Sequence, residues 1–165
     1  MEKKLRTILA AYLTVLLIVF SGSVHAAKAP DFTVFDQSGN SISLIDYRGK
    51  GVVLHFWGTW CPFCRDLQPG LDRLYRKYKG SGLEVLGISI REETGVNPEI
   101  VLKELGVSFK TAVNGDNIAR MYDVPGTPAT FFIDRRGELI WKTHSSNADS
   151  PEFEANIRLI LYLDQ

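Results

Sequence analysis

Cysteine is nearly absent from this sequence: Cys61 and Cys64 are the only two among 165 residues. Any redox or soft-metal chemistry based on cysteine sulfur is therefore confined to this pair. Histidine is also scarce, at three residues, which leaves few candidates for the four ligands of a closed zinc site. The sequence has no repeat, no low-complexity tract and no internal linker, and this pattern indicates one compact domain.

An excess of charge of either sign is absent too. Lys plus Arg number 19, and so do Asp plus Glu. Because Lys3, Lys4 and Arg6 lie at the extreme N-terminus, the rest of the chain is slightly acidic. A slightly acidic protein is not attracted to polyanions, so nucleic acid and anionic membrane surfaces are disfavoured as ligands.

The first 26 residues have the pattern of a bacterial secretory signal. Basic residues precede an apolar run over 8–20, and a small-residue segment ends at Ala26. The apolar run falls short of the ~20 residues that span a bilayer, although an uncleaved anchor is the alternative. We therefore expect a signal peptide at 1–26, a short linker at 27–30 and a periplasmic domain at 31–165, membrane-tethered if the signal is not cleaved.

The two cysteines stand between an aromatic stretch and a segment with helical apolar spacing. Residues 52–57 have the composition of a buried strand, and residues 62–79 that of an amphipathic helix. Cys61 therefore lies at a helix N-terminus, where unpaired N–H groups and the helix dipole favour a thiolate. The dipole contributes only ~0.3–1 kcal/mol at exposed sites, so direct N–H···S contacts must supply part of the activation.

The spacing of the two sulfurs gives them different roles. At positions i and i+3 of a helix they share one face and can close a small ring. We predict that Cys61 is the exposed, attacking thiol and Cys64 the resolving thiol, with Pro62 suited to the first helical position. A static disulfide is the alternative, but the loop it would close is too short to remove much unfolded-state entropy.

The remaining sequence predicts alternating strands and helices, with Pro69 interrupting the helix 62–79 and kinking it and Ser150 as an N-cap. The predicted hairpin is 32–35 with 41–44, the further strands are 83–90, 107–113, 129–134 and 138–142, and the further helices are 98–105, 117–122 and one from 151.

Together these features resemble the thioredoxin fold. The motifs are Trp60-Cys61-x-x-Cys64 after a strand, Pro69 eight residues past the first cysteine, and Gly126-Thr127-Pro128 before a later strand. The signal segment, the N-terminal hairpin, the run 56–61 and an insert around 91–106 resemble the exported TlpA, ResA and cytochrome c maturation proteins. The resemblance implies an α/β fold with a mixed central sheet of four or five strands flanked by helices.

The same resemblance implies a site around the dithiol. The Thr127-Pro128 bond would be cis and lie beside the sulfurs, and the Thr127 backbone would pair with an extended substrate segment. Trp60 would shape the lip of this site or only pack against it. Phe63 brings no charge that would stabilise a thiolate, so we predict a reductant or moderate exchanger rather than a strong oxidant.

Three further residues are candidates for tuning the site. Many thioredoxins carry a buried acidic residue six positions before the first cysteine, and this chain has His55 there. Imidazole can carry a proton near neutral pH, while a neutral core histidine is the alternative. Glu92 and Glu93 follow a strand end, and the resemblance implies that an acidic side chain from this region disfavours the thiolate. A solvated charge pair is the alternative.

The implied function is thiol-disulfide exchange with the Cys61-Cys64 disulfide as the redox group and no other cofactor or metal. The implied partners are protein disulfides, apocytochrome c foremost, and a membrane-embedded electron donor; we expect a monomer. One alternative is a non-enzymatic copper or metal-binding module, for which His55 and His144 are the other histidine candidates. The second is a peroxiredoxin-like peroxidase, which uses one cysteine in a Thr-x-x-Cys setting that this dithiol does not offer.

Overall fold

A computed structural model describes residues 27–163 and contains a five-stranded mixed sheet in the order β5-β4-β3-β6-β7. The central strand β3 (Gly51–Trp57) is parallel to β4 (Leu83–Ser89), which is parallel to β5 (Lys110–Ala112). On its other side β3 is antiparallel to β6 (Ala129–Ile133), which pairs with β7 (Leu139–Thr143). The predicted mixed sheet is confirmed.

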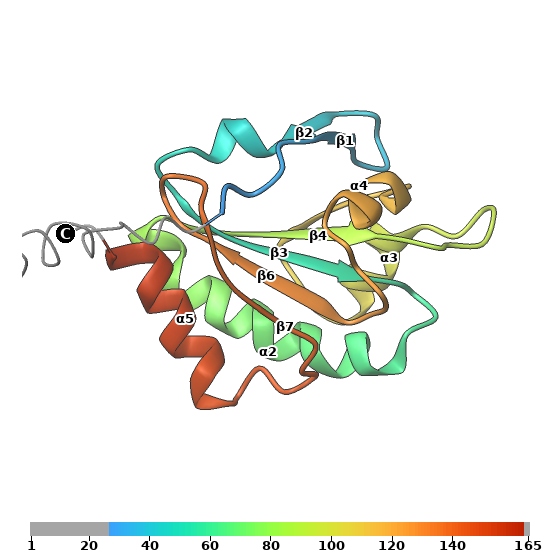
Figure 1. The fold of residues 1–165 in the computed structure, drawn as a ribbon. Coiled ribbons are helices and arrows are strands. Elements are labelled where there is room, and N and C mark those ends of the chain that lie inside the picture. Colours follow the sequence, from blue (N-terminus) through green and yellow to red (C-terminus); the bar gives the residue numbers. More distant parts are fainter. Residues whose placement is uncertain (1–26, 164–165) are drawn as a thin grey trace, which may run out of the picture.

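Helices cover both faces of this sheet (Figure 1). On one face lie α2 (Pro62–Tyr78) and α5 (Pro151–Tyr162). The apolar side chain Leu102 of α3 (Pro98–Glu104) joins the core on this side. On the opposite face lie α4 (Asp116–Met121) and the N-terminal hairpin. The hairpin consists of β1 (Thr33–Phe35) and β2 (Ser41–Ser43), and two 3₁₀ turns occupy Leu44–Tyr47 and Lys79–Ser81.

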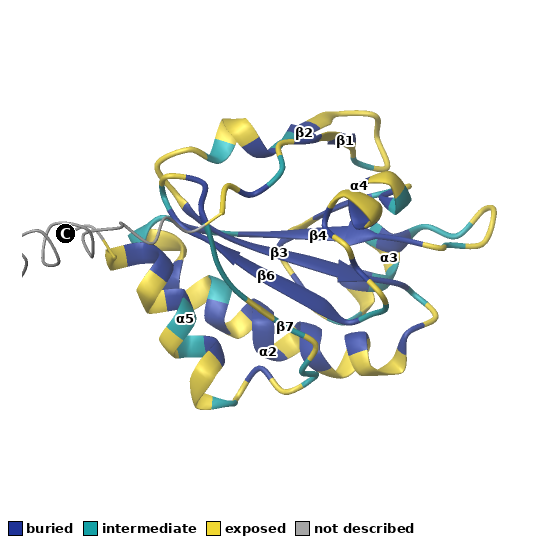
Figure 2. Cartoon of the chain, in the orientation of Figure 1, coloured by how far each residue is buried: buried dark blue, intermediate teal, exposed yellow. Residues whose placement is uncertain are grey.

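Strand β3 is buried along its whole length, because both of its faces are covered (Figure 2). Successive side chains of a strand point to opposite faces. Leu54 and Phe56 therefore join the core beneath the hairpin and α4, whereas Val53 and Trp57 join the core beneath α2 and α5. This burial explains the nearly continuous apolar composition of the strand.

Two local expectations need correction. Residues 27–30 are part of the domain and not a linker: Lys28 forms a β-bridge with Glu138, and Ala29 is buried. Backbone pairing needs no particular side-chain pattern, so the sequence did not reveal it. Pro69 does not interrupt α2, which continues through it to Tyr78.

The signal-peptide prediction concerns residues 1–26, which lie outside the described part of the chain. Within residues 27–163, no helix is both long and apolar enough to cross a membrane.

We expect Asp72 to contribute strongly to stability, because it joins α2 to the segment before β5. Its carboxylate accepts hydrogen bonds from the backbone N–H and the hydroxyl of Ser108, both at 2.7 Å, and from Arg76 at 2.6 Å. Asp72→Ala should lower the free energy of unfolding by about 2–3 kcal/mol, measured by urea denaturation. Asp149→Ala, which removes an exposed partner of Arg73, should change it by less than about 0.5 kcal/mol.

The contribution of Asp72 should also depend on pH. Burial raises the pKa of this carboxyl, but the hydrogen bonds from Ser108 and Arg76 outweigh burial and hold the pKa below its ordinary value. A lowered native pKa stabilises the folded state above the unfolded-state value of about 3.9, and the stabilisation is lost as the pH falls through the native pKa. The difference between wild type and Asp72→Ala should therefore shrink in acid; a difference that grows in acid would contradict this account.

Candidate active site

Cys61 and Cys64 form a disulfide at the start of α2, with their Cα atoms 5.3 Å apart. Cys61 is the N-cap of the helix, and Pro62 occupies the first helical position as predicted. The backbone N–H of Cys64 donates to Cys61 Sγ at 3.2 Å. This is the direct N–H···S contact that was expected to supplement the weak helix dipole. It gives the Cys61 sulfur a hydrogen-bond donor from the backbone of its own helix.

The exposure of Cys61 differs from the expectation. Cys61 is 2% exposed and Cys64 is 0% exposed, so in the disulfide form both residues are buried. The order of exposure agrees with the predicted roles, but the attacking residue is not well exposed. Cys61 belongs to the same buried cluster as Cys64, Leu67 and Trp57.

Aromatic side chains on either side of Cys61 project from the surface. Trp60 is 49% exposed and Phe63 is 61% exposed. The indole N–H of Trp60 donates to the carbonyl of Ile90 at 3.3 Å, and its ring lies so close to Gly58 that a Cβ there would come within 2.5 Å. Trp60 is thus packed against its own loop, as one of the two interpretations has it, while it presents an exposed face; its part in shaping a substrate site stays a prediction.

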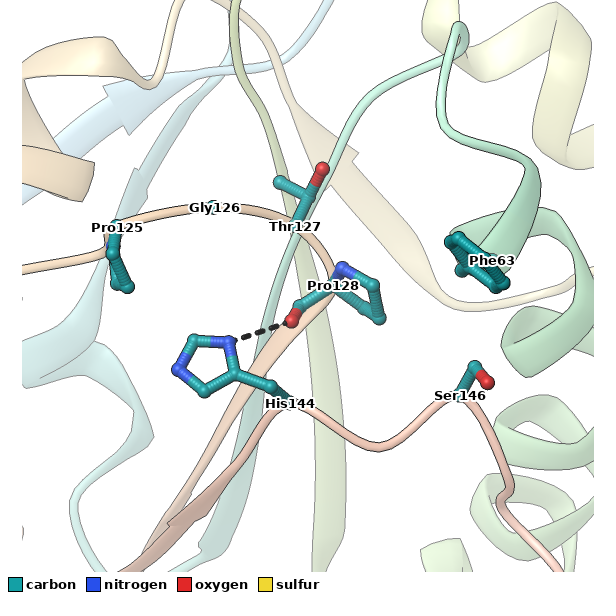
Figure 3. Close-up of a pocket in the computed structure, with 7 residues that line it drawn as sticks. All are labelled: Phe63, Pro125, Gly126, Thr127, Pro128, His144 and Ser146. Atoms are coloured by element: carbon teal, nitrogen blue, oxygen red, sulfur yellow. Dashed lines mark hydrogen bonds between the residues drawn. The ribbon is translucent and has the colours of Figure 1, made fainter.

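A pocket of about 550 Å³ is lined on one side by Phe63, the residue just before Cys64 in the sequence (Figure 3). The loop 125–128 lines the other side. The Thr127-Pro128 peptide bond is cis, as the resemblance implied. The hydroxyl of Thr127 is buried and has no hydrogen-bond partner among the described residues. The pocket therefore offers an aromatic surface and a proline loop, whereas the Thr127 hydroxyl is buried behind the loop.

His144 lines the same pocket, although the sequence offered it only as a candidate for a metal site. Its Nδ1–H donates to the carbonyl of Pro128 at 2.9 Å. The register of the β6-β7 hairpin, which the sequence does not give, explains this placement. Thr130 pairs with Thr143, so the next residue, His144, lies at the start of β6, beside Pro128.

Glu92, and not Glu93, is connected to the dithiol loop. The Glu92 carboxylate accepts from the backbone N–H of Thr59 at 2.8 Å and from the Thr59 hydroxyl at 2.5 Å. The Ser89 hydroxyl also donates to it. Glu93 is exposed. Glu92 thus anchors the turn two residues before Cys61, and its charge is held by three donors.

His55 lies on the α2 side of β3 and is fully buried. Its Nδ1 is 3.1 Å from the hydroxyl of Thr130, and its Nε2 has no hydrogen-bond partner among residues 27–163. Burial lowers the pKa of His55 from 6.5 to about 3. The imidazole is therefore neutral in this disulfide form.

Comparisons with known proteins agree with this geometry. The AhpC/TSA family profile matches residues 26–142. The thiol-disulfide oxidoreductase ResA of Geobacillus thermodenitrificans is 37% identical over 134 residues, which cover 81% of this chain and 74% of that protein. The chain belongs to the AhpC/TSA family and is similar to proteins named ResA. The family resemblance seen in the sequence is confirmed.

Two further relatives extend the comparison. ResA of Bacillus thuringiensis subsp. konkukian is 39% identical over 114 residues, or 68% of this chain, and this match spans just under two thirds, 65%, of the relative's length. A Chlorobium tepidum protein named as a thiol:disulfide interchange protein DsbE has a similar solved structure, with a TM-score of 0.75 and 31% identity. That similarity covers 83% of this chain and 97% of the other, and it confirms the thioredoxin fold.

We expect removal of the Glu92 carboxylate to loosen the turn before Cys61. Glu92→Ala leaves the donors of Thr59 and Ser89 without their acceptor, and should lower the free energy of unfolding of the oxidised protein by about 2 kcal/mol. The matched control Glu93→Ala removes an exposed neighbour and should change it by less than about 0.5 kcal/mol. Urea denaturation measures both, and equal effects would show that Glu92 does not anchor this turn.

Proposed function

We propose that this protein catalyses thiol-disulfide exchange, with the Cys61-Cys64 pair as its redox group. The observation that carries the proposal is the disulfide at the N-terminus of α2, with a backbone N–H donor on Cys61 Sγ. A donor on this sulfur stabilises it as a thiolate in the reduced protein, and the thiolate is the species that attacks disulfides.

The order of the reaction steps follows from the positions of the two cysteines on α2. In the reduced protein Cys61 attacks a substrate disulfide, one substrate sulfur leaves as thiolate, and a mixed disulfide forms. Cys64, one turn into the helix, then attacks Cys61 Sγ and releases the second substrate thiol. The substrate gains two electrons, and the protein returns to the disulfide form described above.

The pocket between Phe63 and the Pro128 loop is the proposed place for the substrate segment beside its cysteine. Extended peptides bind through main-chain hydrogen bonds, for which the backbone of Thr127 is the candidate. Exposed Phe63 and Trp60 provide apolar contact area on the other side. A protein segment with little charge suits these surfaces better than a small polar thiol.

The biological setting is also a proposal. The N-terminal signal pattern supports export to the periplasm, either free or tethered. There the protein would reduce disulfides of exported proteins, such as the haem-binding cysteines of apocytochrome c, and be re-reduced by a membrane-embedded donor. This choice of substrate and donor is supported only by the resemblance to ResA-type and cytochrome c maturation proteins.

The alternatives have less support. A metal-binding module would depend on the two sulfurs, because no group of three or more His, Cys, Asp or Glu side chains gathers within residues 27–163. A one-cysteine peroxidase would not require a second cysteine at disulfide distance from the first.

We expect the Cys64→Ser variant to accumulate mixed disulfides. Without a resolving thiol, Cys61 should stay bonded to its substrate, and the adducts should appear on non-reducing gels of cell extracts and be identifiable by mass spectrometry. Cys61→Ser is the matched control and should trap far less, because the remaining Cys64 is fully buried. If Cys64→Ser traps no protein, or if both variants trap equally, the exchange reaction proposed here is wrong.

The reduction potential should be that of a reductant or moderate exchanger. Since Phe63 offers no charge to a thiolate, equilibration with glutathione should give a potential clearly below the about −120 mV of a strong oxidant. Phe63→His should raise the potential by about 30 mV or more, a tenfold change in equilibrium constant, because a protonated imidazole stabilises the reduced form. A wild-type potential near that of the strong oxidant would refute the reductant assignment.

A further inference from the structure

The loop 125–128 is not anchored by its own side chains. Two of its residues are prolines, and Gly126 stands between Pro125 and Thr127. A Cβ added at Gly126 would meet no atom within 4 Å, so the middle of the loop faces open space. The hydroxyl of Thr127 has no hydrogen-bond partner among residues 27–163. The position of this loop must therefore be fixed from outside it.

His144 supplies a side-chain anchor for the loop. Its Nδ1–H donates to the carbonyl of Pro128 at 2.9 Å (Figure 3). In the part of the chain that the structure describes, no other side chain forms a hydrogen bond with residues 125–128. A carbonyl oxygen can only accept, so this bond needs a proton on Nδ1 in either charge state of the ring. His144 thus ties the end of β7 to the loop before β6.

The same imidazole forms part of the wall of the pocket. Helix α2 contributes Phe63 to the lining, and the segment after β7 contributes His144 and Ser146. In Figure 3 the His144 ring and Phe63 lie on opposite sides of Pro128. The hydrogen bond therefore fixes one wall of the pocket relative to the proline loop.

The lining of the pocket suits an apolar side chain. Phe63, Pro125 and Pro128 provide apolar surface, and Phe63 is 61% exposed in the disulfide form. None of the described residues that line the pocket is Asp, Glu, Lys or Arg. A charged side chain would lose water here without gaining an ion pair, whereas an apolar one gains from burial and from contact with the aromatic ring.

We propose that His144 is a specificity-determining residue for the exchange reaction. Through its bond to Pro128 it positions the wall of a pocket that receives a large apolar side chain next to the substrate cysteine. This inference rests on the proposed function and names the class of substrate segment at the same site. Held in this way, the loop offers the Thr127 backbone to the main chain of the substrate and Pro128 to its side chain.

The selectivity can be measured with symmetric peptide dimers, in which two identical peptides are joined by a disulfide between their single cysteines. The residue next to each cysteine is Leu, Gly or Glu. The reduced full chain is mixed with each dimer, and mass spectrometry of acid-quenched samples follows formation of the protein disulfide. Wild type should react about tenfold faster with the Leu dimer than with the Gly dimer, and slowest with the Glu dimer.

Two variants of matched shape isolate the hydrogen bond. Leu and Asn have similar size and branching, but only Asn has an N–H that can donate to the Pro128 carbonyl. His144→Leu should lower the preference for the Leu dimer over the Gly dimer about threefold or more, and His144→Asn should keep most of it. Because His144 is exposed, both variants should melt close to wild type.

Two controls separate recognition from a general change in reactivity. The small 2-hydroxyethyl disulfide has no side chain to fill the pocket, so wild type and both variants should reduce it at the same rate. Lys142→Ala changes an exposed residue of β7 that does not line the pocket. It should leave the ratio of the Leu and Gly rates unchanged.

The outcomes are distinguishable. If wild type reduces none of these disulfides, the proposed exchange function fails. If it reduces all three dimers at equal rates, exchange stands and recognition of an apolar side chain is overturned. If His144→Leu keeps the preference, or His144→Asn loses it as fully as His144→Leu, the role of the His144 bond is overturned. A variant that slows the small disulfide as much as the Leu dimer also overturns it, because that result indicates a general loss of reactivity.

Discussion

The chemistry of this protein depends on one constraint: a sulfur must be held where a fully buried strand ends and a helix begins. Strand β3 holds the chain before the cysteines in a fixed position, because all seven of its residues are buried. Helix α2 provides a favourable environment for a negative charge on the sulfur, since the backbone N–H of Cys64 donates to Cys61 Sγ. Neither element alone would suffice. A helix N-terminus on a mobile element would not hold the sulfur in place, and a buried strand end without free N–H groups would disfavour a thiolate.

The turn between these elements is held from the side by Glu92. A carboxylate near a thiol raises the cost of forming the thiolate, so its placement matters. Here three donors from Thr59 and Ser89 occupy the Glu92 oxygens. Glu92 therefore fixes the backbone before Cys61, and an effect of its carboxylate on the sulfur stays a prediction.

Most of the fold could be predicted from the sequence because its signals are local. The spacing of apolar residues predicted the central strand, both long helices and the hairpins. The family resemblance predicted the cis peptide bond at Pro128. The features that were missed depend on distant partners. Burial of Cys61 depends on the core cluster packed around it, docking of residues 27–30 follows from backbone pairing, and the place of His144 requires the register of a hairpin. The choice between Glu92 and Glu93 needed the exact end of β4.

His55 on β3 and Gln68 on α2 are fully buried polar residues. An unpaired buried donor or acceptor costs about 1–3 kcal/mol, and both residues carry such atoms. Each of them therefore lowers the stability of the fold relative to an apolar residue of similar size, in the two elements whose ends hold Cys61 in place.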